Sequence, residues 1–72
     1  MMTNYRFKGE FNWYGEIYMM WTTAINEDKA FNNMITRLAG TVKRSRRSVA
    51  NYFNGQIDNY FITKKEEVKN ET

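Results

Sequence analysis

The sequence predicts an all-α fold, a small single-domain helix-turn-helix bundle with a short extended N-terminal segment. Three observations predict it. The 72 residues suffice for one domain, here residues 1–72 with a core in 13–69. Apolar side chains recur at helical spacing in two successive stretches. A basic cluster then lies where a further short helix should begin.

The N-terminal part is expected to be a short extended segment followed by a first helix. Residues 5–13 alternate apolar and polar side chains, which favours a strand-like conformation. The next stretch, residues 13–25, places large apolar residues at spacings of three, one, three and four, so it predicts a helix with Asn12 as N-cap. Gly15 should weaken its first turn.

Three more helices are expected downstream. Asp28 is the predicted N-cap of a second helix that ends at Val42 and has the cleanest amphipathic pattern in the chain. Ser45 is the predicted N-cap of a third helix over 46–54, with Gly55 where helices often finish. The capping-box pattern that starts at Thr63 predicts a fourth helix over 63–69.

Composition excludes several functional classes. The chain has no His and no Cys, so the usual zinc, haem and thiol chemistry is not expected. We therefore predict no enzyme, no catalytic residues, no metal, no cofactor and no small-molecule substrate. The longest apolar run, residues 17–21, is far shorter than a membrane span, and no signal pattern opens the chain, so a cytoplasmic protein without membrane contact is expected.

Positive charge is concentrated in the middle of the chain. The segment 29–57 carries six basic residues and no acid, whereas the rest carries five basic and eight acidic residues. Four of the six positive charges fall within residues 43–47. Arg46 and Arg47 would occupy the first turn of the third helix, where the helix dipole disfavours cations, so we expect this end to meet an anionic partner.

Residues 28–55 fit a helix-turn-helix. Leu38 and Ala39 supply the helix crossing, Val42 closes the turn, and Val49 and Tyr52 anchor the second helix of the motif. The predicted partner-binding residues are Lys43, Arg44, Arg46, Arg47, Ala50, Asn51 and Asn54, with Arg37, Ser45 and Ser48 as phosphate or rim contacts. The pattern departs from the usual one in its turn, where Lys43 and Arg44 replace a glycine and an aliphatic residue. Three packed helices without a recognition surface are the structural alternative.

The stretch 29–55 resembles the lambda-repressor-like helix-turn-helix family of temperate phages, and residues 42–55 look like its turn and recognition helix. The chain also resembles the modulators of repression of lactococcal phages in its size, its basic helix and its aromatic N-terminal segment. This resemblance implies an antirepressor in a lysogenic–lytic genetic switch. Its partner would be the DNA-binding domain of the phage repressor, with an acidic surface that meets Arg44, Arg46, Arg47 and Asn51.

Two other functions stay open. A Cro-like regulator would bind DNA directly, with Arg46, Arg47 and Asn51 on base edges and Arg37, Lys43 and Arg44 on phosphates. A small phage inhibitor that uses the basic face in another way is a third class.

The aromatic and methionine side chains of residues 5–21 are too many for one helix stripe. Some of them must be exposed. An exposed patch of this kind suggests self-association or a heterologous protein partner.

Overall fold

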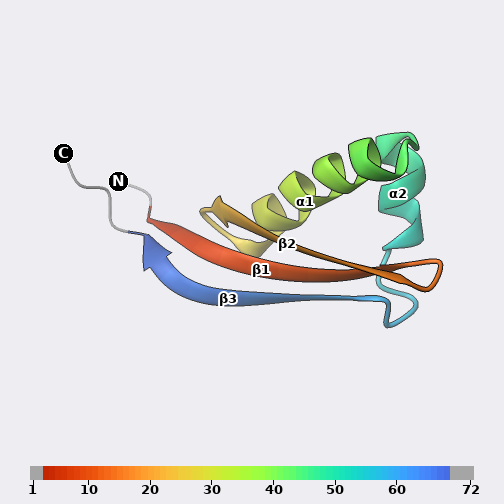
Figure 1. Cartoon of the computed structure of the whole chain (residues 1–72). Coiled ribbons are helices and arrows are strands. Elements are labelled where there is room, and N and C mark those ends of the chain that lie inside the picture. The colour runs from red at the N-terminus through yellow and green to blue at the C-terminus, as the bar shows by residue number, and fades with distance from the viewer. Residues whose placement is uncertain (1–2, 69–72) are drawn as a thin grey trace.

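The computed structural model describes residues 3–68, which form a three-stranded antiparallel sheet with two helices on one of its faces (Figure 1). The elements follow in the order β1 (Asn4–Trp13), β2 (Glu16–Ala24), α1 (Glu27–Val42), α2 (Arg46–Tyr52) and β3 (Tyr60–Val68). β1 is the central strand, between β2 and β3. The all-α prediction is therefore wrong, whereas the extended segment at residues 5–13 is confirmed as part of β1.

The first predicted helix, residues 13–25, is instead the turn of a hairpin and its second strand. β2 pairs with β1 without interruption from Trp13 and Glu16 to Tyr5 and Ala24. The two turn residues, Tyr14 and Gly15, both have positive φ (49° and 91°), the conformation that a tight hairpin turn requires. Asn12 caps this turn, because its Oδ1 accepts from the Gly15 N–H at 2.8 Å.

The apolar residues of the stretch 14–25 fit both the helical period of 3.6 and the strand period of two, which explains why the helix prediction is wrong. Read with a period of two, Tyr18, Met20, Thr22 and Ala24 point towards the helices, whereas Ile17, Met19 and Trp21 point away. A strand paired along its whole length satisfies its main chain and buries Ala24, so the tertiary contacts decide against the helix.

The predicted helix over 63–69 is also wrong within the described residues, and residue 69 lies outside them. Thr63 and Glu66, the ends of the capping-box pattern, lie within β3, opposite Lys8 and Arg6 of β1. The register shifts between Arg6 and Phe7. β3 satisfies the main-chain hydrogen-bonding groups along the second edge of β1. This long-range pairing stabilises the strand conformation more than a local capping box would stabilise a helix.

The second and third predicted helices are confirmed as α1 and α2, except that α2 ends at Tyr52, with Phe53 as its C-cap, and not at Asn54 before Gly55. The N-cap of α1 is Asn26, whose side chain accepts from the Lys29 N–H at 2.9 Å, and not Asp28, which lies in the first turn. Ser45 caps α2 as predicted, accepting from the Ser48 N–H at 3.1 Å. Neither described helix is long and apolar enough to cross a membrane.

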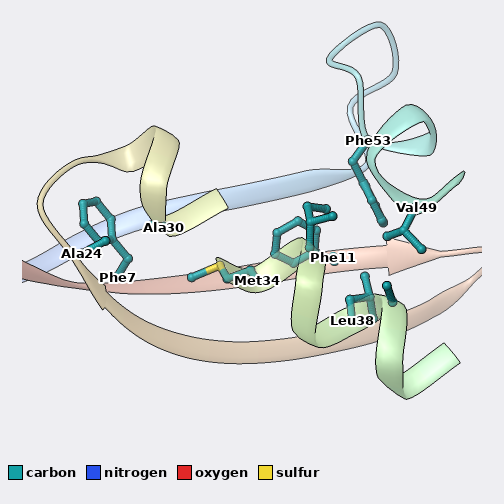
Figure 2. Packing of buried hydrophobic residues seen from close by; sticks show 10 residues of the cluster. Phe7, Phe11, Ala24, Ala30, Met34, Leu38, Val49 and Phe53 are labelled. Carbon is teal, nitrogen blue, oxygen red and sulfur yellow. The ribbon is translucent and has the colours of Figure 1, made fainter. Parts of the chain in front are cut away.

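The core lies between the sheet and the two helices. Figure 2 shows Phe7 and Phe11 of β1 with Met34 between them, and Val49 and Phe53 at the end of the cluster near α2. Phe11 stacks on Tyr60 and meets Phe53 edge to face, with ring centroids 5.6 and 5.1 Å apart. The opposite face of the sheet is covered by no described element (Figure 1).

Candidate nucleic-acid interface

The predicted basic cluster forms the turn between α1 and α2 and the first turn of α2, and we call residues 43–47 the basic tip. All five residues are exposed. Lys43 ends α1 in the left-handed conformation, with φ 58° and ψ 47°, and donates its N–H to the Ala39 carbonyl. Lys43 thus adopts the backbone that glycine favours at a helix end, at a cost of about 1–2 kcal/mol for a residue with a Cβ.

The charges of the basic tip have no acidic partner among residues 3–68. The one ion pair within those residues joins Arg6 and Glu66, at 3.9 Å, on the sheet. No acid occurs between Lys29 and Ile57 in the sequence. The tip is therefore a compact, uncompensated cationic surface.

Arg46 belongs to the tip in sequence, but its guanidinium lies along α1. Its Nε donates to Thr36 Oγ1 at 3.0 Å, and its Nη2 donates to Asn32 Oδ1 at 2.8 Å. Both acceptors are neutral groups, so neither of them compensates the positive charge of the guanidinium. In this position Arg46 joins the two helices.

Arg37, predicted as a phosphate contact, is engaged elsewhere. Its Nη1 donates to the main-chain carbonyl of Trp21 at 2.7 Å, so its guanidinium joins α1 to β2. The structure therefore separates Arg37 from the basic tip.

The remaining predicted residues divide between two sides of α2. Arg47 and Asn51 are exposed and four residues apart, so they share one face, away from the buried Val49. Ala50 and Asn54 instead line a pocket of about 330 Å³ that also contacts Tyr60 of β3.

The two serines are used within the helix start. Ser45 Oγ donates to Ser48 Oγ at 2.9 Å, in addition to accepting from the Ser48 N–H. Ser48 is also at the edge of a second pocket, beside Arg44.

That second pocket contains aromatic residues that the sequence analysis did not assign to the site. It measures about 300 Å³ and is lined by Trp13, Tyr14, Arg44 and Ser48. The Tyr14 ring stacks on Tyr52 of α2, with centroids 4.6 Å apart, and is 73% exposed. The signal in the sequence is the aromatic pair Trp13 and Tyr14 directly before Gly15. It would have indicated these residues if residues 14–15 had been identified as a hairpin turn.

Asn59 holds this end of the molecule together. Its buried side chain donates from Nδ2 to the Tyr52 carbonyl at 2.9 Å, and its own carbonyl accepts from the Asn12 N–H at 2.8 Å. The hairpin, α2 and the start of β3 are thereby fixed in relation to one another. The aromatic turn and Arg44 of the basic tip accordingly line the same pocket.

Comparisons of the chain with protein-family models, with curated proteins and with solved structures give no match. Within residues 3–68, no cluster of three or more His, Cys, Asp or Glu side chains could hold a metal ion. The chemistry of the site is that of a surface with exposed cations, an amide and stacked aromatic rings.

Proposed function

We propose that this protein is a DNA-binding transcription regulator that places the exposed face of α2 and the basic tip against the duplex. The observation that carries the proposal is the cationic surface of Lys43, Arg44 and Arg47, which has no acidic partner in the described chain. Duplex DNA supplies the matching charge at high density.

Each exposed side chain has a role suited to its chemistry. Arg47 and Asn51 share the outer face of α2, and these two residue types form bidentate hydrogen bonds with guanine and adenine edges. Lys43 and Arg44, in the turn, are placed to neutralise phosphates. Tyr14 lies on the hairpin side of the same surface and offers an exposed ring and hydroxyl.

The salt dependence of binding tests this proposal. With three to four neutralised phosphates, affinity should fall roughly 40- to 150-fold between 50 and 200 mM salt. The measurement is fluorescence anisotropy with a labelled duplex of the DNA flanking the gene, and a shuffled duplex as competitor.

Matched variants locate the interface. The double variant Lys43→Gln, Arg44→Gln should weaken binding to all duplexes and reduce the salt slope by about 2. Asn51→Ala should reduce the preference for the flanking sequence. Lys65→Gln is the control, because it removes an exposed cation from β3, away from the tip. Equal binding by all of these variants would refute the assignment.

The antirepressor function is the second candidate, favoured by the exposed Tyr14 beside Arg44. Tyrosine and arginine are the residue types that dominate the energetics of protein–protein interfaces. In this case the basic tip meets an acidic surface on the DNA-binding domain of a phage repressor, and contact with DNA is through the repressor.

A gel-shift experiment with and without the repressor separates the two functions. If this protein alone shifts the flanking DNA and shuffled DNA competes poorly, the DNA-binding function holds. If it shifts no DNA but abolishes the shift produced by the repressor, the antirepressor function holds. The charge reversal Arg44→Glu, Arg47→Glu should remove either activity.

A further inference from the structure

The sheet face opposite the helices exposes four large apolar side chains. Ile17, Met19 and Trp21 point outwards from β2, and Phe61 points outwards from β3; their exposed fractions are 58%, 57%, 43% and 64%. At about 200 Å² for a large side chain, they expose roughly 450 Å² together. The largest apolar patch of a typical monomer measures about 300–600 Å² and is often functional, which makes this face a candidate interaction surface.

Charged residues cross this face in an ordered pattern. One row of opposed residues consists of Trp21, Lys8 and Thr63, and the next row on the same face consists of Met19, Glu10 and Phe61. Gly9 lies between the two rows on β1 and faces the core. The face therefore carries a cation and a carboxylate at equal distances on either side of Gly9.

We propose that this face binds the same face of a second copy of the chain, around a twofold axis that passes over Gly9 at right angles to β1. The axis places each row on the other row of the partner copy. Lys8 then meets Glu10, Trp21 meets Met19, and Thr63 meets Phe61, each pair occurring twice. Opposite charges and a sulfur–aromatic contact are both favourable pairings.

The charge of the face favours a second copy over nucleic acid. Among the outward residues in register, Arg6 is paired with Glu66 at 3.9 Å and Lys8 is balanced by Glu10, so these positions carry no net charge. The same two cations also lie over the Trp21 ring, with Arg6 Cζ 5.2 Å and Lys8 Nζ 6.0 Å from the ring centroid. Because Lys8 of each copy can pair with Glu10 of the other, this surface is complementary to the same surface of a second copy.

The available area is enough for a weak dimer. The apolar side chains of β2 and β3, with the charged residues of β1 between them, should bury about 600 Å² on each copy, the lower end of specific interfaces, so a dissociation constant in the micromolar range is expected. The helices lie on the other side of the sheet, so the basic tip remains uncovered in the pair (Figure 1). This inference is independent of the proposed function.

Sedimentation velocity of the full chain at about 1–200 μM, without DNA, is the test. The wild-type protein should shift from monomer to dimer over this range. Met19→Lys and Phe61→Lys change exposed residues and should each weaken dimerisation at least tenfold, with an unchanged circular dichroism spectrum. Thr41→Lys is the matched control, since Thr41 is exposed but lies on α1, on the other side of the sheet. It should dimerise like the wild type.

A mixing experiment tests the register. Lys8→Glu alone and Glu10→Lys alone each place like charges across the interface, so each variant should be monomeric. An equimolar mixture of the two should form a heterodimer, because both cross-interface pairs regain opposite charge. A wild-type monomer at all concentrations would overturn the dimer. Failure of the mixture to associate would overturn the twofold register.

Discussion

Replacing Gly9 by alanine should destabilise this protein, although alanine is ordinarily preferred to glycine within secondary structure. Gly9 lies in the middle of β1 and is buried beneath α1. A Cβ added there would overlap the Met34 sulfur and come within 2.8 Å of the Phe11 ring. Met34 and Phe11 are both fully buried, so neither side chain has free space to move into.

The expected magnitude follows from these contacts. Overpacking a buried position by one methyl group costs about 1–3 kcal/mol, and the gain from removing a glycine is about 0.5–1 kcal/mol. A net loss of roughly 0.5–2 kcal/mol in the free energy of unfolding is therefore expected. For a domain of this size the melting temperature would fall by about 3–15 °C.

A double-mutant cycle measured by urea denaturation tests the contact itself. Met34→Val removes the sulfur and terminal methyl group that the new Cβ would overlap. In that background, Gly9→Ala should be neutral or stabilising, with a coupling free energy above about 1 kcal/mol between the two sites. If Gly9→Ala stabilises the otherwise unchanged protein, or if the coupling is below about 0.3 kcal/mol, α1 does not lie over Gly9 as described.

Three further predictions concern side chains around the sheet and α2. Arg46→Met should lower the free energy of unfolding by about 0.5–1.5 kcal/mol in urea denaturation through loss of its hydrogen bonds to α1, whereas Arg47→Gln should change it little or raise it by about 0.3–1 kcal/mol. Partial desolvation and the hydrogen bond to the Glu16 carboxylate raise the pKa of Tyr18 above its ordinary value of 10.0. The folded protein therefore favours the neutral phenol, and the stability that the neutral phenol contributes is present below pH 10.0 and is lost as the pH rises through the folded-state pKa. Absorbance titration at alkaline pH should show Tyr18 ionising late, and Glu16→Gln should bring its pKa closer to the ordinary value. Asn59→Ala should cost about 1–2 kcal/mol in thermal unfolding, because the main-chain carbonyl at the end of α2 loses its donor.

Periodicity predicted the elements whose pattern fits one conformation only. In residues 30–42 the apolar positions repeat as adjacent pairs every four residues, which no strand can bury on one side, and α1 follows. The stretch 16–24 fits both periods, and its pairing with β1 decided the outcome. The partner of β3 is separated from it by about 50 residues of chain, so no local pattern could indicate that pairing.

The composition of the basic tip was predictable, but the direction of its side chains was not. A run of cations between two helices is evident from the sequence, and all of its members are exposed. Arg46 and Arg37 differ from Arg47 only in what lies beside them: Asn32 and Thr36 for the first, and a carbonyl of β2 for the second. The neighbour of Arg37 depends on the packing of α1 against a sheet, which the all-α prediction did not contain. The neighbours of Arg46 depend on how α2 crosses α1, which the helix-turn-helix pattern predicts only in outline.

The same strand, β1, organises both surfaces of this molecule. Its core-facing residues hold the helices, and its C-terminal end forms the turn that places Tyr14 against α2. Its outward residues Arg6, Lys8 and Glu10 carry the two cations and the carboxylate at the centre of the open face. Because the two surfaces lie on opposite sides of one sheet, substitution of Met19 or Phe61 leaves the contacts of the basic tip intact. If the proposed function and the proposed dimer both hold, such variants bind a single DNA site with unchanged intrinsic affinity and lose only the avidity that a dimer adds on DNA with two sites.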